Sequence, residues 1–266
     1  MRRRPRPAPC RGWVARSLAG VLAGLLTGAP VSAATLLLCH EDRDAYPWAL
    51  ADGGGLDQAL LARVERVLPV RFAYVALPWR RCLDGLARGL YDGAFAASFD
   101  PERGRQAAFP LEGGVPDRAK RLHTAAYALY RRTGEGPHWD GERFLGLEGR
   151  IGSLSGFSIA DFLRAQGAQV DETSRDPLAL LLMLKNRRFQ AAALQAPRGD
   201  RLLETRPELA GLEKAPTPLQ VKDYYLVFSL RFARDQAEQA RAIWEAVQRE
   251  REALARRGKH QGALAL

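Results

Sequence analysis

The feature that most constrains the fold of this chain is the regular alternation of short apolar runs with amphipathic segments. Runs that suit buried strands lie at residues 35–39, 70–77, 94–97, 123–131, 150–154, 189–194 and 224–229. Segments with helical spacing of apolar residues separate them, at residues 56–67, 80–88, 158–163, 177–184, 201–209 and 233–257. Strands that alternate with helices predict the α/β class, with parallel sheets.

Residues 78–110, PWRRCLDGLARGLYDGAFAASFDPERGRQAAFP, form the most informative single stretch. Leu83, Leu86 and Leu90 have the spacing of one apolar helix stripe, and Gly89 favours a left-handed helix end. The strand predicted next, at residues 94–97, leads into a polar loop. Ligands of open α/β sheets bind at the carboxyl ends of strands.

The polar loop after this strand carries Ser98, Asp100, Glu102 and Arg103. Arg103 is the first candidate to contact a small molecule, because it lies on the loop at the carboxyl end of this strand. The alternative is a structural ion pair between Arg103 and Glu102 or Asp100.

The N-terminal 33 residues have the pattern of a secretory signal peptide. They contain six arginines and no acidic residue, then an apolar run at residues 18–26, then Val31-Ser32-Ala33. We expect cleavage after Ala33 and export to the periplasm. The alternative, a membrane anchor, needs an apolar run of roughly 20 residues. Subtracting the six arginines from the net charge of +10 leaves +4, which does not favour a nucleic-acid partner.

Export also determines how the cysteines are interpreted. Cys10 is removed with the signal peptide, which leaves Cys39 and Cys82. A pair of cysteines in an oxidising compartment favours a disulfide, and the alternative is two buried free thiols. The histidines at positions 40, 123, 138 and 260 lack metal-ligand spacing, so neither a metal nor another cofactor is predicted.

Breaks in the pattern near residues 110–127 and 212–224 predict two crossings between two lobes. We expect residues 34–125 to begin the first lobe and residues 126–213 to form the second. Residues 214–266 then carry the return crossing and a C-terminal helix of the first lobe. The cleft between the lobes is the expected ligand site.

Three further segments supply candidate ligand contacts. Tyr46 and Trp48 lie on the loop after the first strand, and Trp79 lies directly before the helix predicted at residues 80–88. The alternative role of these aromatic residues is packing. The turn of Ser155, Gly156, Phe157 and Ser158 offers backbone N–H groups to an anion, or else is an ordinary turn in which Ser158 caps the next helix. Gln195 lies at the carboxyl end of the predicted strand 189–194.

These segments together resemble the family 3 extracellular solute-binding proteins. The resemblance rests on the stretch 78–110, on IGSLSGFS and NRRFQAAALQ, and covers nearly all of residues 34–257. It implies a type II periplasmic binding protein fold with two crossover strands. Many members serve ABC importers of amino acids. The Cys39–Cys82 pair with Pro78-Trp79 suggests a subgroup of uncharacterised exported members.

The resemblance also implies roles for particular residues. Arg103 matches the arginine that holds the ligand's α-carboxylate, and residues 155–158 match the turn that completes this contact. Phe157 replaces the usual threonine. Gln195 stands where the family has an aspartate that binds the α-ammonium, and Gln190 replaces a further acid. The resemblance therefore implies a small polar ligand with a carboxylate, either amino-acid-like or an organic acid, and the loss of both acids favours a carboxylate without an amine or another small polar metabolite.

Three functions follow as hypotheses. The first is a periplasmic binding protein, predicted to be monomeric, that closes over a small polar or anionic ligand and is read by an ABC permease. The second is a ligand-sensing module for a signalling partner in the membrane. The third is an enzyme, since the same fold hosts a dehydratase, and His40, Glu41 and Asp42 would be its acid–base cluster.

Overall fold

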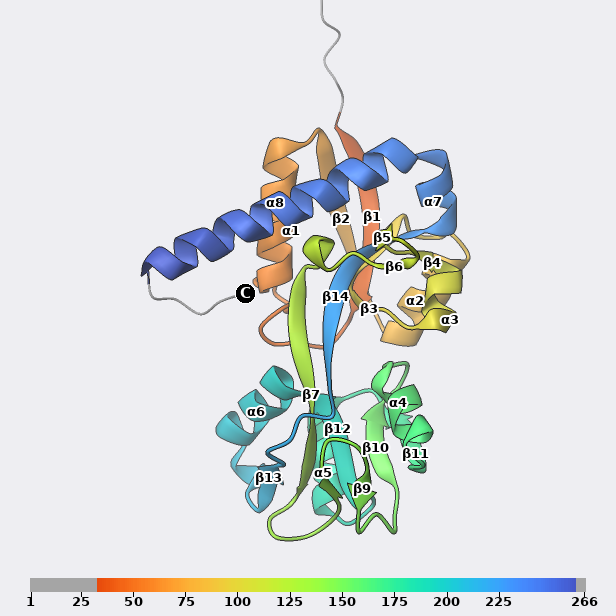
Figure 1. Ribbon diagram of the computed structural model, residues 1–266. Coiled ribbons are helices and arrows are strands. Elements are labelled where there is room, and N and C mark those ends of the chain that lie inside the picture. The colour runs from red at the N-terminus through yellow and green to blue at the C-terminus, as the bar shows by residue number, and fades with distance from the viewer. Residues whose placement is uncertain (1–32, 262–266) are drawn as a thin grey trace, which may run out of the picture. The chain divides into compact units, whose positions relative to one another are not determined.

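The computed structural model describes residues 33–261, with side chains described to residue 257 (Figure 1). The predicted signal peptide, and Cys10 within it, lie outside the described residues. Within residues 33–261, no helix has both the length and the apolar composition that a membrane span requires.

Most strands join one mixed sheet. Its order is β11 (Val170–Ser174), β10 (Ile151–Leu154), β12 (Ala191–Gln195), β7 (His123–Arg132), β14 (Gln220–Ser229), β3 (Gly93–Ser98), β1 (Ala34–Glu41) and β2 (Val70–Leu77). β13 (Leu212–Lys214) pairs with β7, and β4 (Ala107–Ala108) pairs with β14. Two small hairpins are separate from it: β5 (Leu111–Glu112) with β6 (Val115–Pro116), and β8 (His138–Trp139) with β9 (Phe144–Leu145).

The predicted parallel sheets are right at the two ends of this order but wrong in the middle. β1 pairs in parallel with β2 and β3, and β10 pairs in parallel with β11 and β12. β7 and β14 run antiparallel to each other and to their neighbours β12 and β3. β7 carries the chain from one set of parallel strands to the other, and β14 carries it back. The two strands therefore run in opposite directions.

The helices divide between the two parallel sets (Figure 1). We call β1, β2 and β3 lobe A, together with α1 (Leu56–Val67), α2 (Trp79–Ala87), α3 (Pro101–Gln106), α7 (Leu230–Asp235) and α8 (Ala237–Gln261). Lobe B contains β10, β11 and β12 with α4 (Ile159–Ala165), α5 (Pro177–Lys185) and α6 (Ala196–Thr205). The residue boundaries of the lobes given by the sequence stay predictions, because β7 and β14 contribute to both.

Each lobe has its own apolar core. In lobe A, α1 and α8 cover one face of the sheet, and Leu38, Leu61 and Phe95 are fully buried there. In lobe B, α5 is apolar nearly all round and packs on β10 and β12. Burying such residues supplies the main stabilisation of each lobe. Leu90, predicted to extend the α2 stripe, is instead 57% exposed because the chain turns away at Gly89, which has a φ of +69°.

Several element boundaries differ from the sequence predictions. The polar loop after β3 contains a helix, α3, which Asp100 caps by accepting a hydrogen bond from the Arg103 N–H. α6 begins directly after Gln195, five residues before the predicted start. The predicted final helix is two helices, and the second continues through Gly258 to Gln261.

Gly55, at the start of α1, is required by the close approach of the preceding loop. A Cβ atom there would overlap the carbonyl oxygen of Trp48 and lie 2.7 Å from the Cα of Ala49. That same carbonyl accepts the Asp57 N–H at 2.8 Å. We therefore expect Gly55→Ala to lower the free energy of unfolding by about 1–3 kcal/mol, measured by urea denaturation.

Gly54→Ala is the matched control for this change. Its Cβ would meet only the flexible side chain of Asp52, at 3.1 Å, so a loss of less than about 1 kcal/mol is expected. Equal losses in the two variants would show that the loss at Gly55 comes from glycine flexibility and not from this close approach.

Candidate functional site

A small cavity lies where the carboxyl ends of β1, β3 and β12 meet the strands β7 and β14. Lobe A lines it with His40, Glu41, Ala45, Ala49, Trp79, Phe95, Ala96, Ser98 and Arg103. Lobe B and the two crossing strands add Tyr127, Phe157, Ser158, Gln195 and Tyr224. The cavity is small: its free volume of about 30 Å³ holds about two water molecules. This space is smaller than a ligand the size of an amino acid.

Arg103 is buried in this cavity and contacts both lobes. In lobe A its guanidinium donates to the backbone carbonyl and the hydroxyl of Ser98, and it lies 3.5 Å from the Asp100 carboxylate. Its Nη2 donates to the Gly156 carbonyl of lobe B at 3.3 Å. The Trp79 ring lies 5.9 Å from the guanidinium carbon, within reach of a cation–π contact. Both of the roles considered for Arg103, ion pair and ligand anchor, are compatible with this position.

A hydrogen-bonded chain of polar side chains joins the lobes beside Arg103. The hydroxyls of Ser98 and Ser158 lie 2.8 Å apart, and Lys222 Nζ donates to Ser158 Oγ at 2.8 Å. Ser158 stands at the N-cap position of α4, but its side chain makes no cap hydrogen bond. The predicted capping role is therefore wrong, because Ser98 and Lys222 engage its hydroxyl instead.

The turn of residues 155–158 presents fewer free backbone N–H groups than the sequence predicted, because three of its four N–H groups are bonded to protein acceptors. The Ser155 N–H donates to the Ser174 carbonyl at 2.9 Å, and the Gly156 N–H to the Glu172 carboxylate at 3.3 Å. The Phe157 N–H donates to the Leu154 carbonyl at 3.2 Å. The turn thus faces Arg103 with an acceptor, the Gly156 carbonyl, and carries a carboxylate behind it.

Gln195 lies in the cavity wall as predicted, and its amide donates to the Tyr224 hydroxyl at 3.1 Å. Burial raises the pKa of Tyr224, and burial raises the pKa of Tyr127 well above its usual value. Both phenols are therefore neutral hydrogen-bonding groups at physiological pH. This part of the wall carries no formal charge.

Glu41 and Arg198 form the second polar link between the lobes. Arg198 Nη2 lies 2.7 Å from Glu41 Oε2, and its Nε donates to the Asp44 carbonyl at 2.8 Å. Arg198 is only 3% exposed. Desolvation raises the pKa of Glu41, and the Arg198 charge opposes that shift. Glu41 thus faces the cavity with its charge already paired.

The aromatic candidates are distributed over three places. Trp79 lines the cavity, whereas Tyr46 lines a separate open groove where Arg201 lies over its ring at 5.4 Å. Trp48 stacks on His123, with ring centroids 4.0 Å apart, and His123 stacks in turn on Tyr224 at 4.6 Å. Packing, the alternative role considered for Trp48, is its role here.

His123 starts β7 and is fixed from lobe A. Its Nδ1 lies 2.9 Å from the Asp57 carboxylate, and both side chains are almost fully buried. His123 also pairs across the sheet with Tyr224 of β14. This contact anchors both crossing strands to α1 at the edge of the cavity.

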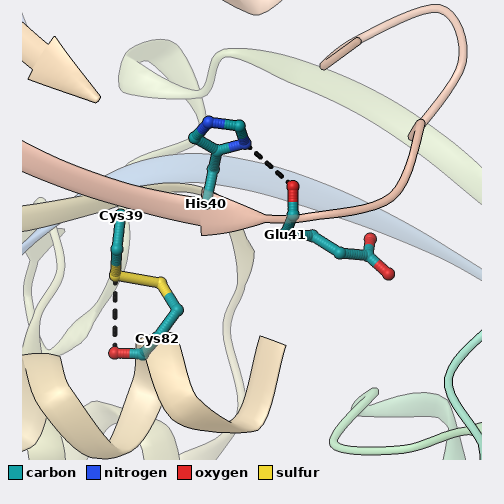
Figure 2. The surroundings of a disulfide bond; sticks show 4 residues. All are labelled: Cys39, His40, Glu41 and Cys82. Carbon is teal, nitrogen blue, oxygen red and sulfur yellow. Dashed lines mark hydrogen bonds between the residues drawn. A yellow bond between two sulfur atoms is a disulfide. The ribbon is translucent and has the colours of Figure 1, made fainter. Parts of the chain in front are cut away.

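A disulfide joins Cys39 of β1 to Cys82 of α2, and this confirms the predicted pairing. Figure 2 shows that the cavity residues His40 and Glu41 directly follow Cys39 on the same strand. His40 Nδ1 donates to the Glu41 carbonyl at 2.9 Å, and desolvation lowers the pKa of His40. The bond thus fixes the strand end that forms one cavity wall. Among the described residues, no group of three or more metal-ligating side chains is present.

Comparisons with known proteins identify the fold. A scan against protein-family models and a search of curated protein sequences each found no match. A histidine kinase sensor domain with similarity to periplasmic binding proteins matches in structure with a TM-score of 0.66. The two are 17% identical, and the match covers 86% of this chain and 93% of that one. The chain has the type II periplasmic binding protein fold.

Two ligand-bound structures share this periplasmic binding protein fold. The GluR0 ligand-binding core from Nostoc punctiforme in complex with L-glutamate is 15% identical; the match covers 82% of this chain and 93% of that one, with a TM-score of 0.63. The amino acid ABC transporter substrate-binding protein AbpA from Streptococcus pneumoniae, bound to L-arginine, is 17% identical. That match covers 82% of this chain and 90% of AbpA, with a TM-score of 0.62.

Six of the predicted ligand contacts line this cavity: Ser98, Arg103, Phe157, Ser158, Gln195 and Trp79. Their contact with a ligand stays a prediction. The sequence-based prediction omitted Lys222 and Tyr224. The last strand was predicted to start at residue 224, which placed Lys222 in a loop, and the crossing strands were not expected to line the ligand site. The prediction also omitted Arg198, which follows Pro197 in the first turn of α6. A helix predicted from this proline would have placed Arg198 beside Gln195.

Proposed function

We propose that this protein is an exported solute-binding protein whose two lobes close over a small ligand with a carboxylate or similar anionic group. The observation that carries the proposal is the position of Arg103. Its buried guanidinium lines the cavity at the carboxyl ends of β1, β3 and β12, and it contacts both lobes. Buried guanidinium groups bind carboxylates with a paired, directional geometry.

The charge around Arg103 supports an anionic ligand. The Asp100 carboxylate, at 3.5 Å, balances Arg103 only in part because it also caps α3. The Gly156 carbonyl offers a neutral acceptor in place of a charge. A ligand carboxylate that replaced this carbonyl would make a charge-assisted bond of roughly twice the strength. A ligand that contacts Arg103 of lobe A and Ser158 of lobe B at the same time would favour the closed arrangement of the lobes.

The structural neighbours support a ligand of amino-acid size, since their bound ligands are glutamate and arginine. Binding is favoured over catalysis because the candidate acid–base residues are engaged by protein groups: Glu41 by Arg198, and His40 by the Glu41 carbonyl. The Cys39–Cys82 disulfide supports an oxidising compartment such as the periplasm.

A sensing role is the second candidate function, and the likeness to a histidine kinase sensor domain over 86% of this chain supports it. The two roles differ in their partner, an ABC permease or a membrane-bound sensor. Deleting the gene should abolish uptake of the labelled ligand if the role is import. A sensing role would leave uptake intact and abolish the transcriptional response to the ligand.

The proposal is tested by calorimetric and thermal-shift titration of the purified protein with amino acids, organic acids, polyamines and small sugars. At a hundredfold excess over its dissociation constant, a true ligand adds about 2.7 kcal/mol to the free energy of unfolding. We expect one carboxylate class to bind, and we expect Arg103→Met to weaken that binding at least a hundredfold, because a buried charge-assisted pair is lost.

Arg105→Met is the matched control, since Arg105 lies on the same helix, is exposed, and does not line the cavity. Arg103→Lys keeps the charge and is expected to recover only part of the affinity, because it lacks the planar fork. Binding that is unchanged in Arg103→Met, or the absence of any ligand across the set, would contradict the proposed function.

A further inference from the structure

Lys222 is a charged residue at the site that no sequence pattern assigned. It lies on β14, where it pairs with Ala125 of β7, so it belongs to the crossing strands and to neither parallel set. Its ammonium group donates to Ser158 Oγ at 2.8 Å, directly behind the cavity wall. None of the ion pairs among the described residues includes Lys222, although it is largely shielded from water. A shielded ammonium without a carboxylate partner is costly unless it serves another contact.

The hydrogen bonds around Lys222 contain more donors than acceptors. Lys222 donates into Ser158 Oγ from one end, and Arg103 donates into Ser98 Oγ from the other. Only one hydroxyl hydrogen is needed for the bond between the two serines. The other hydroxyl hydrogen has no acceptor among the hydrogen bonds of the described residues. Since both serines line the cavity, that hydrogen is available to an acceptor inside it.

Three N–H groups of the neighbouring turn are already bonded to protein acceptors. The N–H groups of Ser155, Gly156 and Phe157 are all bonded within lobe B, one of them to the Glu172 carboxylate. An anion in the cavity is therefore attracted to the Ser98–Ser158 pair. Arg103 lies at the Ser98 end of this pair and Lys222 at the Ser158 end, and both are cations.

The described part of the cavity offers an ammonium group no unpaired carboxylate. Gln195 is neutral, with its Nε2 donating to Tyr224, and Glu41 is paired with Arg198. An unpaired ammonium in a desolvated site costs several kcal/mol, which disfavours a ligand that carries one.

We propose that Lys222 is a second cationic anchor of the ligand site, and that the ligand is a small carboxylate without an amino group. The inference rests on the proposed function and deepens it. Arg103 binds the carboxylate from lobe A. Lys222, on the crossing strand β14, donates to Ser158 Oγ and so leaves a serine hydroxyl hydrogen free to bind the carboxylate.

The titration of Lys222 gives the proposal a distinctive pH dependence. Burial, together with the charge of Arg103, lowers the pKa of Lys222 to about 8, and the charges of Asp100 in the N-cap of α3 and Asp161 in α4 oppose this shift. A bound anion favours the protonated lysine. Affinity for the anion should therefore fall as pH rises through 8, by about tenfold between pH 7 and pH 9.

The experiment compares ligands that differ only in an amino group, such as succinate with aspartate and 2-oxoglutarate with glutamate. Dissociation constants are measured by calorimetry at pH 6.5, 7.5 and 9.0. We expect the amine-free member of a pair to bind at least tenfold tighter. Lys222→Met should weaken its binding about tenfold at pH 6.5 and remove the pH dependence. Lys222→Arg should keep the affinity and also remove the dependence, because arginine stays charged.

Lys185→Met is the matched control, since Lys185 is exposed at the end of α5 and contacts only a backbone carbonyl. Tighter binding of the amino acid in each pair, lost in Arg103→Met but unchanged in Lys222→Met, would overturn this inference and leave the proposed function intact. Failure of every ligand to bind the wild-type protein would overturn both.

Discussion

Replacing Cys39 and Cys82 together with alanine is expected to lower the free energy of unfolding by about 4 kcal/mol. The bond links residues 43 positions apart in the sequence, so its loss releases a long loop in the unfolded chain. The chain-entropy relation for a loop of this length gives roughly 4 kcal/mol at 25 °C. Alanine is preferred to serine because both cysteines are fully buried, and a buried hydroxyl would add a cost of its own.

Guanidinium denaturation with and without a reducing agent measures this effect. Reduction should shift the wild-type transition to lower denaturant and leave that of the double variant unchanged. A wild-type midpoint that is insensitive to reduction, once loss of the bond has been verified by mass, would contradict the prediction. Since His40 and Glu41 follow Cys39 in sequence, ligand affinity should fall with the bond as well.

Replacing Arg198 with methionine is expected to cost about 3–5 kcal/mol at neutral pH, because Glu41 would then be a buried charge without a partner. The pH dependence has a definite sign. The pKa of Glu41 is raised in the folded state, so the folded state binds this proton more tightly than the unfolded state does. Stability of the variant should therefore recover as pH falls toward the pKa of Glu41.

A double-mutant cycle isolates the pair. Glu41→Gln combined with Arg198→Met should be more stable than Arg198→Met alone, because no uncompensated carboxylate remains. Arg201→Met, on the same helix but exposed, is the control and should change stability by less than about 1 kcal/mol. Additive losses across the cycle would show that Glu41 and Arg198 do not depend on each other.

The sequence predicted best what burial alone determines. β2 spans Val70–Leu77 and α1 spans Leu56–Val67 as predicted, because an apolar run and an apolar stripe define them. An Asp-Pro pair opens α5 at Asp176, and the same pair at Asp100 opens α3. Predicting α3 therefore required no information beyond the sequence.

The predictions failed at polar residues that have several possible hydrogen-bond partners. β11 has the sequence VDETS, which contains no apolar run, yet it supplies the Ser174 and Glu172 acceptors that engage the backbone of the turn at 155–158. Ser158 has the residue type of a helix cap, and local sequence cannot show that Lys222, 64 residues later, binds its hydroxyl. The polar start of β14 likewise gave no strand signal.

The strands β7 and β14 have a mechanical consequence that follows from their double use. They connect the lobes, and they also supply the floor of the cavity through Tyr127 and Tyr224, with Lys222 beside them. The floor therefore belongs to the connection between the lobes rather than to either lobe. Direct links between the lobes come from other residues, among them Arg103 with Gly156 and Glu41 with Arg198. Arg103 takes part in both, because it lines the cavity and also joins the lobes. A change at Arg103 would therefore alter the cavity and the link between the lobes together, whereas a change at Tyr127 would alter the floor.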